Sequence, residues 1–163
     1  EALRLFPEDG YFLKYQGELL WMKGKCADAL EVFADAREKT NNGITQLELD
    51  KFLNPYGRET VKTCQQLLDV GQKDGAMKLM ALWYRLLPEN PSVREYYYLA
   101  RASVAKKRSE VEELIGEILK RIDAERAESP GENNDIQIYK RALTKAWERL
   151  GYPGELARVR TDA

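Results

Sequence analysis

Apolar residues recur along this chain at the three- and four-residue intervals of helices, and few segments alternate polar and apolar positions as a strand does. Between residues 26 and 39, for example, Ala29, Phe33 and Ala36 are spaced to pack against one neighbour. Glycine and proline interrupt the pattern at helix-length intervals, as before Pro55. The sequence therefore predicts an all-α fold. The expected helices cover residues 11–22, 26–39, 45–53, 58–70, 75–87, 92–107, 109–128 and 135–150, with a last turn or two after Pro153.

The first third of the chain carries the markers of a helical repeat. Gly17 and Ala29 are small enough to let the two helices of a hairpin approach closely, while Leu20 and Phe33 fill the space beside them. On these markers the chain resembles the tetratricopeptide-repeat (TPR) family of helical repeat proteins. The residues at the marker offsets are Leu13, Gly17, Leu20, Gly24, Ala29, Phe33 and Ala36.

The resemblance implies a right-handed superhelix of stacked antiparallel helical hairpins, forming a single TPR-like domain over residues 1–163. Because the chain opens at Glu1 with what resembles the end of a preceding repeat, we expect it to be a fragment of a longer chain. The expected units are 1–7 as the end of that preceding repeat, 10–41 and 57–88 as repeats, 93–128 as a degenerate repeat and 135–163 as a partial or capping repeat, with insertions at 42–56 and about 125–136.

The composition excludes several classes of function. Lys and Arg (26) nearly balance Asp and Glu (27), whereas a protein dedicated to coating a polyanion should be more basic. The chain has no histidine, which excludes Ser-His-Asp and Cys-His catalysis and histidine zinc sites. Cys26 and Cys64 are too few for a disulfide scaffold, so we expect two separate reduced thiols. With no nucleotide-binding loop and no apolar run near 18 residues, we expect no enzyme activity, cofactor, metal or membrane insertion.

The resemblance also implies a partner-binding wall, because in TPR proteins the first helix of each hairpin lines a concave groove. In the third hairpin, Arg94, Tyr97 and Arg101 share one helical face through their i, i+3, i+7 spacing. Arginine can hold a carboxylate through two parallel N–H bonds, so the expected ligand is a protein or peptide with an acidic segment. The family positions select as partner-binding residues Tyr11, Lys14, Trp21, Arg58, Gln65, Arg94, Tyr97, Arg101, Arg141 and Lys145.

These observations favour a non-catalytic scaffold that binds a peptide segment or a partner protein in the concave groove. Two alternatives stay open. One is an architectural spacer in a long solenoid, as in polysaccharide-secretion proteins; the other is an RNA-processing scaffold, because residues 138–143 resemble a half-a-TPR repeat. The tyrosines at 96–98, beside the basic stretch 94–108, are residue types that stack on bases and contact phosphates. Since consecutive helical residues point in different directions, a protein partner is favoured over nucleic acid.

Overall fold

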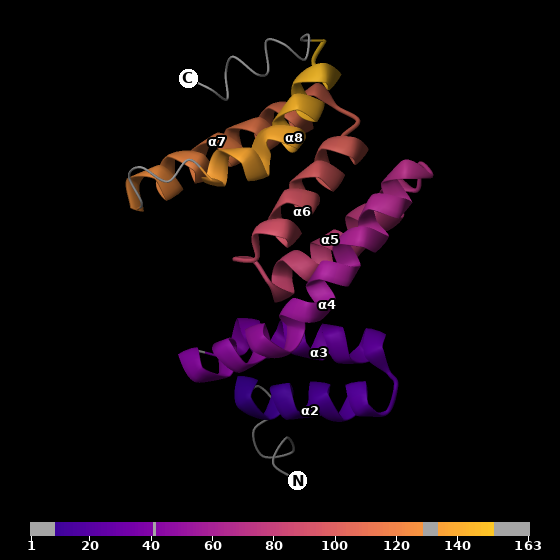
Figure 1. Cartoon of the computed structure of the whole chain (residues 1–163), viewed down its shortest axis with the longest axis vertical. Coiled ribbons are helices and arrows are strands. Elements are labelled where there is room, and N and C mark those ends of the chain that lie inside the picture. Colours follow the sequence, from indigo (N-terminus) through magenta and orange to yellow (C-terminus); the bar gives the residue numbers. More distant parts are fainter. Residues whose placement is uncertain (1–8, 41, 129–133, 152–163) are drawn as a thin grey trace.

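The computed structural model describes residues 9–40, 42–128 and 134–151, and within these ranges the regular structure is helical. The prediction of an all-α fold is confirmed. The helices follow one another along the long axis of the molecule, from α2 at one end to α7 and α8 at the other (Figure 1). Residues 1–7 and the expected turn after Pro153 lie outside the described residues. The helices are α2 (Gly10–Met22), α3 (Cys26–Lys39), α4 (Gly43–Asp69), α5 (Lys73–Leu86), α6 (Pro91–Val104), α7 (Arg108–Glu128) and α8 (Asn134–Arg149).

The turns that join α2 to α3 and α4 to α5 have the same geometry. Gly24 and Gly71 adopt φ angles of 75° and 77°, in the left-handed region that glycine occupies without strain. In the first turn the N–H of Gly24 donates to Trp21 O and the N–H of Lys25 donates to Leu20 O. The second turn repeats both hydrogen bonds at the corresponding positions, so two helical hairpins end and restart in the same way.

Helix α4 departs from the prediction of two segments separated before Pro55, which is wrong. One 27-residue helix contains Pro55, and Figure 1 shows it changing direction near its middle. Proline lacks an N–H and so cannot bond the carbonyl of Lys51, which explains a bend. Both halves are nevertheless anchored, because Leu49 and Leu53 are buried before the proline and Cys64 is buried after it. Tertiary packing on both sides thus holds a helix that local propensity would interrupt.

The buried side chains form two apolar clusters that share α6. The first joins α2, α3, α4 and α5, and it includes Phe33, Leu53 and Met80. The second joins α7 and α8 and includes Ile118 and Leu143. Helix α6 contributes Val93 and Ala100 to the first cluster and Tyr98 and Ala102 to the second, so it connects the two halves of the core.

The close approach predicted for the first hairpin is present. A Cβ atom added to Gly17 would lie 2.5 Å from Cδ1 and Cε1 of Phe33, so the ring of Phe33 occupies the space that a side chain at position 17 would need. Ala29 and Phe33 are both fully buried. The small residue on α2 and the large one on α3 are therefore complementary, as the repeat pattern predicts.

The two cysteines differ in exposure, and we expect them to differ in reactivity. Cys26 is exposed, whereas burial raises the pKa of the Cys64 thiol to about 11. At pH 8 a thiol reagent should therefore modify Cys26 in the folded protein and reach Cys64 only after unfolding, because the thiolate is the reactive form. The folded chain also keeps the Cys64 proton to higher pH than the unfolded chain, so the free energy of unfolding should fall as pH rises from about 9 to about 11. Mass spectrometry of the labelled protein, with and without urea, checks the first expectation; rapid labelling of both thiols in the native protein would contradict it.

Within the described ranges, no helix combines the length and the apolar composition that crossing a bilayer requires.

Candidate partner-binding surface

The side chain of Arg141 on α8 connects α8 with α6 and α4. Its Nη2 donates to Gln65 Oε1 on α4 at 3.0 Å, and its Nη1 donates to Glu95 Oε1 on α6 at 3.0 Å and to Tyr96 Oη at 3.2 Å. The guanidinium also lies over the Tyr96 ring, 5.2 Å from its centroid. The hydrogen bond to Tyr96 raises the pKa of Arg141 above its ordinary value. Residues 76 positions apart thus meet on one surface, which we call the Arg141 face (Gln65, Glu95, Tyr96 and Arg141).

The Arg141 face includes two of the residues selected from the sequence, Gln65 and Arg141, but it corrects the register of α6. The α6 residues beside Arg141 are Glu95 and Tyr96, where the repeat alignment placed Arg94, Tyr97 and Arg101. At about 100° per residue, positions 94, 97 and 101 share one side of a helix, whereas positions 95 and 96 lie on roughly the opposite side. No glycine occurs between α6 and α7 to anchor the alignment, so the sequence offered little to fix the register.

Tyr97 and Arg101 face α5 and α7 instead. The Tyr97 ring is stacked parallel to that of Tyr84 on α5, with centroids 4.2 Å apart, and burial raises the pKa of Tyr97. Arg101 Nη1 donates to Glu117 Oε2 on α7 at 2.5 Å, while Tyr98 Oη donates to Glu117 Oε1 at 3.0 Å. Tyr97 and Arg101 are therefore half-buried residues that join α6 to its neighbours.

The three consecutive tyrosines do not share one surface, since the rings of Tyr97 and Tyr98 meet edge to face with centroids 5.3 Å apart, whereas Tyr96 lies on another side of α6. Tyr96 lies against Arg141, Tyr97 is stacked on Tyr84, and Tyr98 packs against Tyr139 with centroids 5.6 Å apart. The three rings therefore do not form a common platform on which bases could stack.

Arg94 is a buried structural residue, so the expectation that it lines an accessible wall is not met. Its side chain is only 7% exposed. Its Nε donates to Pro88 O at 3.2 Å, and Nη2 donates to Glu89 Oε2 at 2.7 Å. Nη1 donates to Glu125 Oε1 at 2.5 Å and to Tyr139 Oη at 3.3 Å. These bonds satisfy most of the guanidinium within the protein and tie α6 to α7 and α8.

Lys14 is likewise buried, while Tyr11 beside it is exposed. The Lys14 ammonium is bonded to the carboxylate of Glu48 on α4, lies 3.6 Å from Glu18 Oε1, and sits 4.4 Å from the Tyr15 ring centroid. Its contacts join α2 to the first half of α4. The Tyr11 hydroxyl lies 3.2 Å from that of Tyr15, and both rings are more than 40% exposed.

Of the other partner-binding residues selected from the sequence, Trp21 is half-buried, whereas Arg58 and Lys145 are exposed. Trp21 is half-buried in an aromatic cluster, with its ring 5.7 Å from Phe52 and 4.7 Å from Tyr56, both on α4. Arg58 on α4 and Lys145 on α8 are exposed, and neither forms an ion pair within the described ranges. Trp21 thus serves packing, whereas Arg58 and Lys145 remain accessible to a partner.

One exposed apolar stripe on α2 was only partly identified from the sequence. Tyr11, Tyr15, Leu19 and Met22 follow one another at intervals of four, four and three residues and are all exposed. Of these four residues, Tyr11 is among the partner-binding residues selected from the sequence. The spacing itself was the available signal, since i, i+4, i+8 and i+11 positions share one side of a helix.

Chemically, the Arg141 face offers recognition groups. Two of the five guanidinium N–H groups of Arg141 are not engaged by Gln65, Glu95 or Tyr96, and its side chain is 48% exposed. The aromatic ring beneath the guanidinium and the carboxylate beside it hold the cation in a fixed orientation. A partner's carboxylate or backbone carbonyl can then accept its free N–H groups at little further cost in side-chain entropy.

Comparison of the chain with models of protein families, with curated proteins and with solved structures finds no match.

Proposed function

We propose that the protein is a non-catalytic, TPR-like scaffold that binds a segment of a partner protein along the Arg141 face. The observation that carries the proposal is the set of bonds from Arg141 to α4 and α6. These bonds bring side chains of α4, α6 and α8, the first helices of three successive expected hairpins, onto one surface. A shared surface of this kind suits an extended or helical peptide, which contacts several hairpins in turn.

Three features support the stacked-hairpin architecture. The turns at Gly24 and Gly71 repeat the same hydrogen bonds, which is typical of successive copies of one structural unit. Gly17 and Ala29 lie in the close contact that the repeat requires. Helix α6 packs on α4 and α5, and α8 packs on α6 and α7, so neighbouring hairpins pack in chain order.

Arg141 gives the test of this surface. We expect Arg141→Ala to weaken the partner complex by about 1–3 kcal/mol, or roughly 5- to 150-fold in Kd, because arginines are frequent energetic centres of interfaces. A photoreactive residue at the exposed Lys145 would first capture the partner in cells. Calorimetry with the purified partner would then measure Kd for the parent protein and for Arg141→Ala.

The matched control is Arg126→Ala, which removes an exposed arginine from α7. The proposal requires this variant to bind within about twofold of the parent protein, as distant surface changes do. Equal losses in both variants, or no loss in either, would exclude the Arg141 face as the binding surface. If the captured protein forms no saturable complex after purification, the spacer function takes its place.

A further inference from the structure

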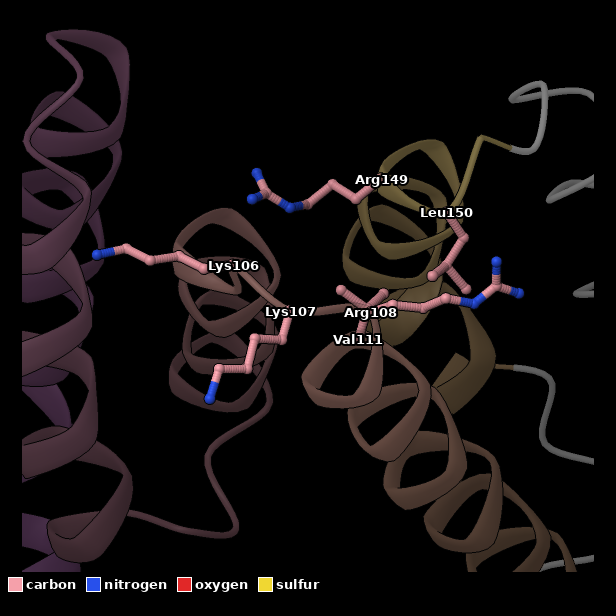
Figure 2. A pocket seen from close by; sticks show the side chains of 6 residues that line it. All are labelled: Lys106, Lys107, Arg108, Val111, Arg149 and Leu150. Atoms are coloured by element: carbon pink, nitrogen blue, oxygen red, sulfur yellow. The ribbon is translucent and has the colours of Figure 1, made fainter.

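A hollow of about 490 Å³ lies where the turn between α6 and α7 meets the last turn of α8. Its lining residues are four cations and two apolar side chains: Lys106, Lys107, Arg108, Val111, Arg149 and Leu150. In Figure 2, Arg149 extends toward the turn that carries Lys106 and Lys107, while Arg108 points to the other side, beside Leu150. The positive groups are thus distributed around the hollow and do not converge on one point.

Three of the four cations form no ion pair with a carboxylate among the described residues. Within the described ranges, neither Lys106 nor Lys107 has a carboxylate oxygen within ion-pair distance of its ammonium. Arg149 donates to two backbone carbonyls, at Ser103 and Ala105, which satisfy N–H groups but do not cancel the charge. Arg108 is the exception, since its Nε donates to Glu112 Oε1 at 2.7 Å.

A second carboxylate, that of Glu110, is hydrogen-bonded to the backbone of the turn and also attracts the ammonium groups of Lys106 and Lys107. Glu110 Oε2 accepts the N–H of Lys106 at 2.8 Å and the N–H of Lys107 at 3.2 Å, and these bonds hold the pKa of Glu110 below its usual range. Such bonds cap the first turn of α7 and fix the shape of the turn. The bonds from Arg149 to the carbonyls of Ser103, in the last turn of α6, and of Ala105, which follows it, fix the other wall, so the hollow is formed without a ligand.

The arrangement favours an acidic polypeptide over the other anions. A single small anion needs cations that converge on it, whereas these are spread over three elements. Single-stranded nucleic acid binds best where aromatic rings stack on its bases, and no aromatic ring is among the described lining residues. Leu150, which is half-buried, and the edge of Val111, which is only 3% exposed, form a small apolar patch between the charges, which suits an apolar side chain of a peptide.

We propose that this hollow, the basic pocket, docks an acidic segment of a partner protein, with carboxylates on Lys106, Lys107 and Arg149 and an apolar side chain against Val111 and Leu150. This inference rests on the proposed function, because it takes the ligand to be a partner protein. It adds that an acidic segment of that partner binds in the basic pocket. It also adds a second binding site, built from different residues than the Arg141 face.

The experiment measures fluorescence anisotropy of a labelled peptide with a central leucine between two runs of glutamate, added to the full chain. We expect saturable binding that weakens at least about tenfold in the double variant Lys106→Glu/Lys107→Glu, because charge reversal removes two attractions and adds two repulsions. Replacing the central leucine of the peptide by glutamine should weaken binding by about threefold or more, since the apolar patch would then be left unfilled.

The matched control is Lys23→Glu/Lys25→Glu, which reverses two exposed lysines in the turn between α2 and α3. It makes the same change in net charge and should leave peptide affinity within about twofold of the parent protein. Equal losses in the two double variants would mean that the peptide senses only the overall charge, and the proposal would be overturned. Far-UV circular dichroism and thermal melting confirm that both variants are folded.

Two further measurements test whether the pocket binds nucleic acid and whether the two proposed binding sites are independent. If a single-stranded RNA of matched charge binds more tightly than the peptide and loses affinity in Lys106→Glu/Lys107→Glu, the pocket serves nucleic acid and the proposal is wrong. Arg126→Ala, which removes an exposed arginine outside both surfaces, should leave peptide binding unchanged. The two proposals can fail separately. If Lys106→Glu/Lys107→Glu weakens peptide binding but Arg141→Ala leaves the complex with the captured partner intact, the Arg141 face is wrong and the basic pocket stands. If Arg141→Ala weakens that complex but Lys106→Glu/Lys107→Glu leaves peptide binding intact, the basic pocket alone is wrong.

Discussion

Replacing Arg94 with methionine should lower the free energy of unfolding by about 3–5 kcal/mol, because it leaves the carboxylate of Glu125 largely buried with one cation fewer. Glu125 Oε1 accepts hydrogen bonds from Arg94, Arg121 and Tyr139, while its Oε2 is buried without a partner among the described residues. Removing Arg94 therefore takes one hydrogen bond and one cation from a carboxylate whose second oxygen already has no partner among the described residues. Urea denaturation followed by circular dichroism measures the change.

Neutralising Glu125 as well as Arg94 tests whether the incompletely paired Glu125 carboxylate causes the loss of stability. In the background of Arg94→Met, the further change Glu125→Gln should recover at least about 1 kcal/mol, because a neutral amide costs less to bury than a carboxylate that has lost one of its two cations. Arg126→Met, on the exposed side of α7, is the control and should cost less than about 0.5 kcal/mol. If Arg94→Met costs as little as the control, the Arg94 guanidinium is solvated and accessible, and its exclusion from the binding surface is wrong.

The second large effect concerns the contact between α2 and α3. Phe33→Ala should destabilise the protein by about 3–5 kcal/mol, because Phe33 is fully buried and its loss leaves a cavity between the helices. Gly17→Ala should cost about 1–3 kcal/mol, since its Cβ would lie 2.5 Å from two atoms of the Phe33 ring. In the Phe33→Ala background the same Gly17→Ala change should instead be neutral or stabilising, because the clash is gone and alanine favours a helix over glycine by about 1 kcal/mol.

This reversal of sign is the decisive result, and chemical denaturation of the four proteins in the cycle measures it. Gly75→Ala is the control, because the nearest atoms to a Cβ at that position are 3.9 Å away. The control should show no dependence on the residue at position 33. A cost of Gly17→Ala that is the same with and without the Phe33 ring would show that the two residues are not complementary.

Residues close together in the sequence were sufficient to predict the structure where a glycine ends a helix or a small residue allows a close helix contact. Gly24 and Gly71 end helices in the left-handed conformation, and Ala29 is buried as the repeat spacing requires. The all-helical fold and the first two hairpins could therefore be predicted from residues close together in sequence. These signals depend on backbone conformation and side-chain size, which the sequence states directly.

The remaining features depend on packing between distant segments. Proline at position 55 reads as a helix end, yet the buried leucines before it keep α4 continuous. Arg141 lies 45 positions after Tyr96, so no local pattern could indicate which side of α6 faces α8. Arg94 resembles a surface residue until the positions of Glu125 and Tyr139 are known. The same uncertainty explains why Arg94, Tyr97 and Arg101 of α6 lie away from the face that Gln65 and Arg141 share.

The bent helix α4 has a consequence for how the protein opens. In a simple repeat array each unit contacts only its neighbours, so the end unit can unravel while the rest stays folded. Here the first half of α4 is bonded to the first hairpin through Lys14–Glu48 and Arg37–Asp50, and its second half packs against α5. A continuous helix of 27 residues, about 40 Å long, therefore transmits any displacement of the first hairpin into the second. We therefore expect the two hairpins to unfold together rather than one at a time.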